Sequence, residues 1–230
     1  MEPSAPDPAP PPQGARRVAS TKRRGRMTDG KRAVLAALGP RLGLDLDDRP
    51  LGTRLTAAFG RVAPRLLDVG IGSGEATVAW ARAHPDHDVV AVELHPPSLV
   101  AALAAVDESG LVNLRVAEAD VRVLLDRAEP GDVDHMRLLF PDPWPKRRHH
   151  HRRLVDAALW VQLGQVVPAG GTFHLATDWE GYAAEVRFLL GEDPCWTVLA
   201  GPPPTRPITP YERICLDAGR PITDLVARRR

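Results

Sequence analysis

A single carboxylate lies in a rigid frame within residues 140–153, which read Phe-Pro-Asp-Pro-Trp-Pro-Lys-Arg-Arg-His-His-His-Arg-Arg. Asp142 stands between Pro141 and Pro143, and each proline fixes its own φ angle and restricts the residue before it. Trp144 follows, and the segment ends in eight consecutive Lys, Arg or His residues. A fixed acid beside an aromatic ring and a dense basic run is typical of a site that binds a nucleobase and its phosphates. The same pattern also fits a Pro-rich surface turn before a solvated basic helix.

A second candidate site is the glycine-rich turn Asp-Val-Gly-Ile-Gly-Ser-Gly at residues 68–74. Gly70, Gly72 and Gly74 permit a tight turn and a close approach of the backbone to a ligand. Their spacing departs from the dinucleotide fingerprint Gly-x-Gly-x-x-Gly, since the residue after Gly74 is Glu. The carboxylate of Asp68 is unfavourable beside a pyrophosphate but suits a ligand with ammonium and sulfonium charge. The turn therefore favours S-adenosylmethionine (SAM) over a nicotinamide cofactor.

Two further acids extend this pocket. Glu93 ends the second predicted strand, 25 residues after Asp68, where a carboxylate can accept hydrogen bonds from both ribose hydroxyls. Asp120 follows the third predicted strand, where the adenine edge would lie. Because open α/β sheets bind ligands at the carboxyl ends of their strands, three acids in these places strengthen the prediction of a SAM pocket.

The elements that must position these residues alternate between strand and helix from residue 65 onward. Strands are predicted at 65–69, 88–92, 111–117, 134–140, 172–176, 196–199 and 222–227, and helices at 31–38, 53–59, 75–84, 98–106, 154–166 and from about 180 to 190. This alternation predicts a Rossmann-like α/β fold, with a mostly parallel seven-stranded sheet and helices on both faces.

Composition bounds the domain organisation. The chain has 230 residues, of which 43% are hydrophobic, enough for a core. Residues 1–21 are Pro-rich and expected to be disordered, and residues 22–230 are expected to form one domain that begins with a basic segment. The net charge of +1 conceals basic clusters within residues 13–32, 146–153 and 228–230, which favour a polyanion-binding face.

Other features narrow the cofactors and the compartment. Cys195 and Cys215 form neither a disulfide framework nor a zinc spacing. The histidines at 149–151 have no accompanying ligand pattern, so we expect no metal. No apolar run approaches the length of a membrane span and no signal peptide is recognisable. We therefore expect a cytoplasmic protein, a monomer or homodimer, that does not contact a membrane.

The rigid acidic segment also resembles the signature of a known family. Phe140-Pro141-Asp142-Pro143-Trp144-Pro145-Lys146 is similar to a motif of the bacterial tRNA (guanine-N7)-methyltransferases, and other similar motifs follow in the same order: Ala176-Thr177-Asp178-Trp179 and Arg206-Pro207-Ile208-Thr209-Pro210-Tyr211-Glu212. Shorter matches occur at residues 24–28 and 113–116, so the resemblance covers about residues 22–228. It implies a class I SAM-dependent methyltransferase fold and methyl transfer to N7 of guanosine at nucleotide 46, in the tRNA variable loop.

The resemblance implies a role for each matching residue. Asp142 would be the catalytic residue and would line the SAM pocket together with Asp68, Gly70, Gly72, Gly74, Glu93 and Asp120. The target guanosine would be bound by Lys146, Asp178, Thr209, Pro210, Tyr211 and Glu212, and the tRNA by Arg147, Arg148, Arg152 and Arg153. The family usually has Lys where Pro210 stands and Arg-Gly soon after the Glu, where this chain reads Arg213-Ile214-Cys215. A cation is therefore missing, and Arg206 or Arg213 could replace it.

Alternatives remain open at this stage. One alternative is a SAM-dependent methyltransferase acting on another RNA. A methyltransferase acting on a protein or a small molecule would explain the glycine turn and the acids but not the basic run or the Pro-Asp-Pro-Trp motif. A nucleic-acid-binding module with a vestigial cofactor pocket would explain the basic run but not the glycine turn with its acids. Sequence also leaves open whether Asp142 or Asp178 dominates catalysis, and whether Trp144 and Trp179 pack inside the protein or stack on a base.

Overall fold

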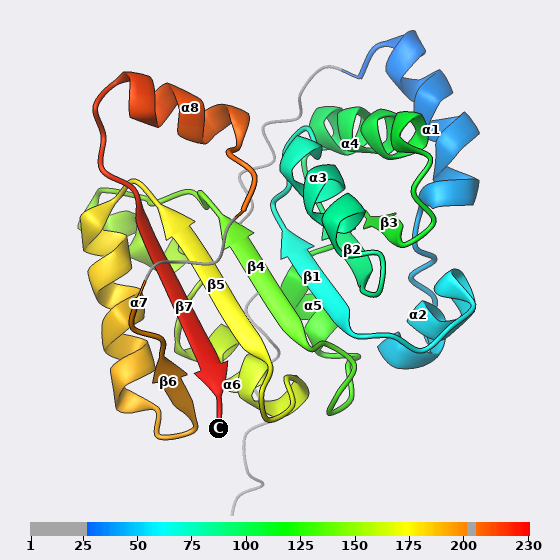
Figure 1. Cartoon of the computed structure of the whole chain (residues 1–230). Coiled ribbons are helices and arrows are strands. Elements are labelled where there is room, and N and C mark those ends of the chain that lie inside the picture. The colour runs from blue at the N-terminus through cyan, green and yellow to red at the C-terminus, as the bar shows by residue number, and fades with distance from the viewer. Residues whose placement is uncertain (1–26, 202–205) are drawn as a thin grey trace, which may run out of the picture.

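The computed structural model describes residues 27–201 and 206–230. Seven strands form one sheet in the order β3-β2-β1-β4-β5-β7-β6 (Figure 1). The strands are β1 (Arg65–Val69), β2 (Asp88–Val92), β3 (Leu114–Ala117), β4 (His135–Leu139), β5 (Thr172–Thr177), β6 (Trp196–Val198) and β7 (Thr223–Arg229). β1 to β5 pair in parallel, whereas β7 runs antiparallel to β5 and β6. The expected mostly parallel seven-stranded sheet is confirmed.

The helices connect these strands. They are α1 (Asp29–Leu42), α2 (Leu51–Phe59), α3 (Glu75–Ala83), α4 (Pro96–Ser109), α5 (Val121–Leu125), α6 (Ala157–Val166), α7 (Glu180–Glu192) and α8 (Pro210–Asp217), with a 3₁₀ helix η1 at Arg147–Arg152. Sequence patterns missed α5, η1 and α8 because each is too short for a helical hydrophobic period to be recognised. The third strand is also shorter than expected at its start, where the side-chain amide of Asn113 binds the carbonyls of Ala81, His84 and His87 instead.

Two hydrophobic clusters cover the opposite faces of the sheet. Successive side chains of a strand point to opposite faces, so Leu66 packs with α1, α3 and α4, whereas Leu67 packs with α5, α6 and α7. In Figure 1, α5 and α6 lie behind the sheet. Both clusters run up to the ends of the strands, so the core holds the carboxyl edge of the sheet in place.

Helix α8 lies beyond the carboxyl ends of β4 and β5, over the same edge of the sheet (Figure 1). It begins with a capping box: the Thr209 hydroxyl accepts a hydrogen bond from the Glu212 amide, and the Glu212 carboxylate accepts one from the Thr209 amide. Pro210 occupies the first helical position, where no amide hydrogen is needed. A capping box followed by Pro was therefore a readable helix signal in the sequence.

Some of the expectations from sequence concern residues that the structure does not describe. Most of the Pro-rich tail and basic segment, residues 1–26, lies outside the described residues, as do residues 202–205 of the Pro-rich loop. Within the described ranges, none of the helices has the length and apolar character needed to cross a membrane.

Candidate active site

Two adjoining cavities lie at the carboxyl edge of the sheet. The first, of about 420 Å³, is lined by residues that include Glu93, Asp120, Trp144 and Arg152. The second, of about 370 Å³, is lined by the glycine turn and by the start of α8. The walls of both include Val69, Gly70, Leu139, Pro141 and Asp142. Asp142 therefore stands where the two cavities meet, as a residue acting on two bound molecules must.

The backbone around Asp142 is held in an unusual conformation. Phe140 has φ 54° and Trp144 has φ 42°, and bulky residues rarely adopt such left-handed angles without support from their surroundings. Support comes from the Phe140 amide, which donates to the Ala176 carbonyl at 2.7 Å. Asp142 itself is exposed and accepts no hydrogen bond from any residue in the described ranges. The frame thus fixes the backbone at Asp142 and leaves the carboxylate oxygens available.

Arg153 supplies the second support and has a different role from the one expected. Its side chain is buried, its Nε donates to the Pro143 carbonyl at 2.9 Å, and its guanidinium pairs with Glu185 and lies 4.9 Å from the Tyr182 ring centroid. A buried guanidinium cannot reach an RNA phosphate. The expectation that Arg153 contacts tRNA is therefore wrong, and its role is to brace the loop that carries Asp142.

The glycine turn presents backbone to the cavities. Gly70, Gly72 and Gly74 have φ angles of 72°, 58° and 84°, which other residues rarely adopt. A side chain at Gly74 would also approach the Cα of Ala102 within 3.3 Å, so glycine there lets α3 pack closely on α4. Nothing lies within 4 Å of the Cβ positions at Gly70 and Gly72, so a ligand can approach the backbone at those residues.

Two acids lie on the wall of the first cavity. The Oε1 atom of Glu93 accepts hydrogen bonds from the amides of Leu94 and His95 at 2.8 Å each, and its Oε2 accepts one from Gly72 at 3.1 Å. Asp120 caps α5 by accepting from the Arg122 amide at 3.0 Å. The amides orient both carboxylates, so they form a preorganised acceptor pair at the ends of β2 and β3.

Asp68 lies on the second cavity but is not a free charge. It is buried, and Arg137 binds both of its oxygens, with Nε–Oδ1 3.0 Å and Nη2–Oδ2 2.5 Å. Thr77 donates a further hydrogen bond to Oδ2 at 2.6 Å. Asp68 therefore supports the glycine turn as part of a neutral pair, and its expected attraction for a cationic ligand is largely offset by Arg137.

Some residues at the start of α8 line the second cavity, and others only support the helix. Thr209, Pro210 and Tyr211 line the second cavity. Glu212 instead is buried and paired with Arg206, so it supports the first turn of α8, and its expected contact with a guanosine stays a prediction. Because Pro210 is suited to the first turn of the helix, its presence in place of Lys leaves the geometry of this wall intact.

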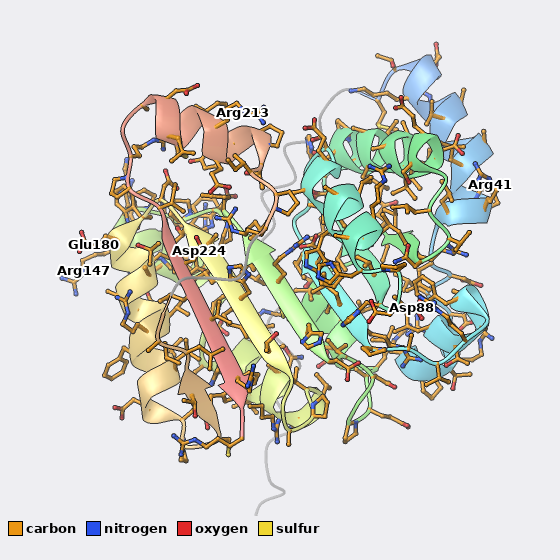
Figure 2. All side chains as sticks on the ribbon, in the orientation of Figure 1. Arg41, Asp88, Arg147, Glu180, Arg213 and Asp224 are labelled. Atoms are coloured by element: carbon orange, nitrogen blue, oxygen red, sulfur yellow. The ribbon has the colours of Figure 1, made fainter. Side chains whose placement is uncertain are left out.

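Arg206 connects the first turn of α8 to β7, because it pairs with Glu212 and also with Asp224. It binds Asp224, at the start of β7 below α8 (Figure 2), with Nε–Oδ1 2.9 Å. Burial raises the pKa of Asp224, but hydrogen bonds from His174 and Arg206 outweigh burial and lower that pKa to about 2. Arg206 is thus committed to two carboxylates, while Arg213 is exposed on α8 (Figure 2). Neither is positioned to replace the missing cation in the second cavity.

Asp178 follows β5 and lies behind Tyr211, which lines the second cavity. Its side chain is nearly buried, forms an ion pair with Arg220 and accepts a hydrogen bond from the Tyr211 hydroxyl at 3.3 Å. Sequence patterns did not single out Arg220, because it lies 42 residues from its partner and outside every recognisable motif.

The basic segment lies beside the first cavity. Lys146, Arg147 and Arg148 are exposed, and Arg147 projects outward from the molecule (Figure 2). Arg152 turns inward instead: its guanidinium lies 4.8 Å from the Trp144 ring centroid, and both side chains line the cavity. The expected tRNA contact therefore suits Arg147 and Arg148, whereas Arg152 faces the cavity with Trp144.

Comparisons with known proteins bear on this arrangement. A family model described as "Putative methyltransferase" matches residues 62–225. The tRNA (guanine-N(7)-)-methyltransferase of Halorhodospira halophila is 41% identical over 216 residues, which cover 91% of this chain and 93% of that protein. The chain belongs to the tRNA (guanine-N7)-methyltransferase family. The resemblance of the motif around Asp142 to this family is therefore confirmed.

Solved structures support the fold of this tRNA (guanine-N7)-methyltransferase family member. The aminoglycoside resistance methyltransferase NpmB1 has a TM-score of 0.56 at 15% identity, covering 78% of this chain and 93% of that one. A SAM-dependent O-methyltransferase from Thermotoga maritima has a TM-score of 0.50 at 18% identity, covering 78% of this chain and 63% of that one. These similarities establish a class I methyltransferase fold.

Proposed function

We propose that this protein transfers the methyl group of SAM to N7 of a guanosine in tRNA, at nucleotide 46 of the variable loop. The observation that carries the proposal is the place of Asp142, which lines both cavities and is held between two left-handed residues. The exposed cations at residues 146–148 follow at the end of the same loop and in the first residues of η1. Family membership adds the substrate and the atom that is methylated.

The residues of the first cavity fit a nucleoside. Glu93 and Asp120 stand at the ends of β2 and β3 with oriented oxygens, and a carboxylate oxygen that accepts one hydrogen bond can accept another. Glu93 would hold the ribose hydroxyls and Asp120 the adenine edge, while the open backbone of Gly70 and Gly72 would face the methionine portion. When bound, SAM supplies an electrophilic methyl group on a sulfonium centre.

Methyl transfer to guanine N7 does not require a general base. Guanine N7 carries a lone pair and no proton, so the nucleophile needs no deprotonation. The protein's contribution is then alignment of the two reactants, which can supply about 7–11 kcal/mol of the barrier, and placement of charge. Methylation makes the guanine cationic, and the carboxylate of Asp142, which has no ion-pair partner among the described residues, would stabilise that charge as it develops. No metal is required for such a step.

Asp178 would bind the target guanine and distinguish it from other bases. The hydrogen bonds that Tyr211 and Arg220 donate to this carboxylate both fall on Oδ2, so Oδ1 is the oxygen that neither of them uses, and the Cys215 thiol is a further polar neighbour. An oxygen held in this way can accept the N1 and N2 hydrogens of guanine and distinguish it from adenine. Tyr211, which is 42% exposed, could stack on the base. Lys146 lies on the loop that carries Asp142 and would reach the same nucleotide.

The exposed basic residues would bind the tRNA backbone. Each phosphate neutralised by a cation such as Arg147 or Arg148 releases counterions, so affinity should fall steeply with salt, with a slope near −0.9 per contact in duplex regions. This substrate would place the protein in the cytoplasm.

Methyl transfer to tRNA tests the proposal directly. Purified protein is incubated with tritium-labelled SAM and an unmodified tRNA transcript, or with the matched transcript that carries adenosine at nucleotide 46. Borohydride and aniline cleavage then maps N7-methylguanosine. We expect incorporation only in the first transcript, with cleavage at nucleotide 46. Label that resists ribonuclease, or none in any tRNA, would refute the proposal.

Variants at the two acids divide the roles. Asp142→Asn should lower kcat about 10²–10³-fold, the range seen when one preorganised electrostatic contact is removed. Asp178→Asn should mainly raise the KM for tRNA. Near-normal turnover in Asp142→Asn together with abolished turnover in Asp178→Asn would reverse this assignment.

A further inference from the structure

We propose that Arg220 is a positioning residue of this site, which holds Asp178 and Tyr211 in the orientation that binds the target guanine. This inference rests on the proposed function and adds a residue to it. Arg220 lies in the link between α8 and β7, outside the two cavity walls. It would act through its neighbours and not by contact with the reacting atoms.

The side chains of Asp178 and Tyr211 meet at Arg220, so three separate segments of the chain are joined there. Its Nη1 pairs with Asp178 Oδ2 and lies 3.4 Å from the Tyr211 hydroxyl, and its guanidinium carbon lies 5.6 Å from the Tyr211 ring centroid. The same Tyr211 hydroxyl donates to Asp178 Oδ2 at 3.3 Å. Arg220 therefore connects the end of β5 to the first turn of α8, although Asp178 and Tyr211 are 33 residues apart in the sequence.

This arrangement selects which oxygen of Asp178 is available. The contacts from Arg220 and Tyr211 both use Oδ2, so the carboxylate cannot rotate without losing them, and Oδ1 is left for a ligand. The Asp178 side chain is only 8% exposed, whereas that of Arg220 is 40% exposed. The charge of a shielded carboxylate needs a partner to offset it, and Arg220 is that partner, which also fixes the orientation of the carboxylate.

Tyr211 links this triad to the catalytic loop. Its ring centroid lies 5.4 Å from that of Phe140, the left-handed residue two positions before Asp142. Tyr211 and Phe140 both line the second cavity. Movement of Tyr211 after loss of Arg220 would therefore open the wall against which a base would lie, while the brace from Arg153 to Pro143 would still hold Asp142.

Asp178 and Asp142 also differ in whether a neighbouring cation offsets their charge. Arg220 offsets the negative charge of Asp178, so Asp178 acts mainly by orientation. Asp142 has no cationic partner in the part of the chain that the structure describes, so it keeps its charge for the developing guanine cation. Loss of Arg220 should therefore impair substrate binding more than the chemical step.

The test measures steady-state methylation of tRNA by Arg220→Ala, Arg220→Lys and Arg213→Ala. Arg220→Ala should raise the KM for tRNA at least tenfold and change kcat less than threefold, with unchanged SAM affinity by calorimetry. Arg220→Lys keeps the charge but not the fork of donors and should give an intermediate KM. Added guanidinium chloride at millimolar concentration should lower the KM of Arg220→Ala and not that of wild type.

Arg213→Ala is the matched control, because it removes an exposed cation from the same α8 region without touching Asp178 or Tyr211. It should raise the KM less than threefold. Equal effects of Arg213→Ala and Arg220→Ala would reduce Arg220 to a general RNA-binding charge and overturn the inference, as would a normal KM in Arg220→Ala. Lost SAM binding in Arg220→Ala would also overturn it, by assigning Arg220 to folding. An inactive wild type would instead sink the proposed function.

Discussion

The buried pair between Asp68 and Arg137 gives the sharpest energetic prediction. Both side chains are 4% exposed. Removing one partner of such a pair costs about 3–5 kcal/mol, because the other charge is left uncompensated in the interior. In Arg137→Met the Thr77 hydroxyl still donates to Asp68, so we expect the lower end, about 3 kcal/mol. For a domain of this size that corresponds to a loss of roughly 6–12 °C in Tm.

A double-mutant cycle tests this reasoning. Asn at residue 68 keeps the shape of the acid without its charge, so the Asp68→Asn, Arg137→Met double variant should recover to within about 1 kcal/mol of wild type. The coupling free energy should then exceed about 2 kcal/mol. Urea unfolding followed by circular dichroism measures all four proteins, since Trp80 lies beside Arg137 and would disturb a fluorescence signal.

An exposed pair serves as the control. Arg41 and Asp107 form an ion pair whose side chains are 59% and 42% exposed, so Arg41→Ala should cost no more than about 1 kcal/mol. A coupling below about 0.5 kcal/mol for Asp68 and Arg137 would refute the reasoning. Asp68 would then be a free acid beside the ligand, as sequence alone indicated.

Three further predictions concern the scaffold and the basic segment. Asp224 has its pKa lowered from 3.8 to about 2; a depressed pKa contributes stability that is present above pH 3.8 and lost as the pH falls through 2. Asp224→Asn should therefore cost about 2 kcal/mol at pH 6 and progressively less below pH 4, and a cost that does not change with pH in urea titrations would contradict this. Arg153→Met should lower kcat and cost about 2–4 kcal/mol of stability, whereas Arg147→Ala should leave stability unchanged and reduce the salt slope of tRNA binding by about 1; the reverse pattern would restore Arg153 as an RNA contact. Thr209→Ala should destabilise by about 1 kcal/mol through loss of the cap of α8, and an unchanged urea midpoint would show that the cap contributes nothing.

Much of the fold follows from local patterns. Runs such as Leu66 to Val69 are short, mostly apolar and followed by glycine, which specifies a strand and a turn without reference to distant residues. The carboxyl ends of parallel strands meet at one edge, so the neighbourhood of Glu93, Asp120 and Asp142 could also be inferred. The capping box at Thr209 is equally local, since residues 209–212 form it by themselves, so it marks the start of α8 where the helix is too short to show a hydrophobic period.

The direction of each charged side chain depends on partners far along the chain. Asp68 and Arg137 are separated by 69 residues, and Asp178 and Arg220 by 42; no local pattern shows that they pair. Arg153 and Glu212 belong to motifs that indicated contact with RNA and with guanosine, yet burial turns both into supports. Sequence alone determined the fold class, the family and the acids at the sheet edge, because these depend on residue type and spacing. Tertiary structure decided which of those acids and cations remain free for a ligand, because a charge brought into the interior must be paired.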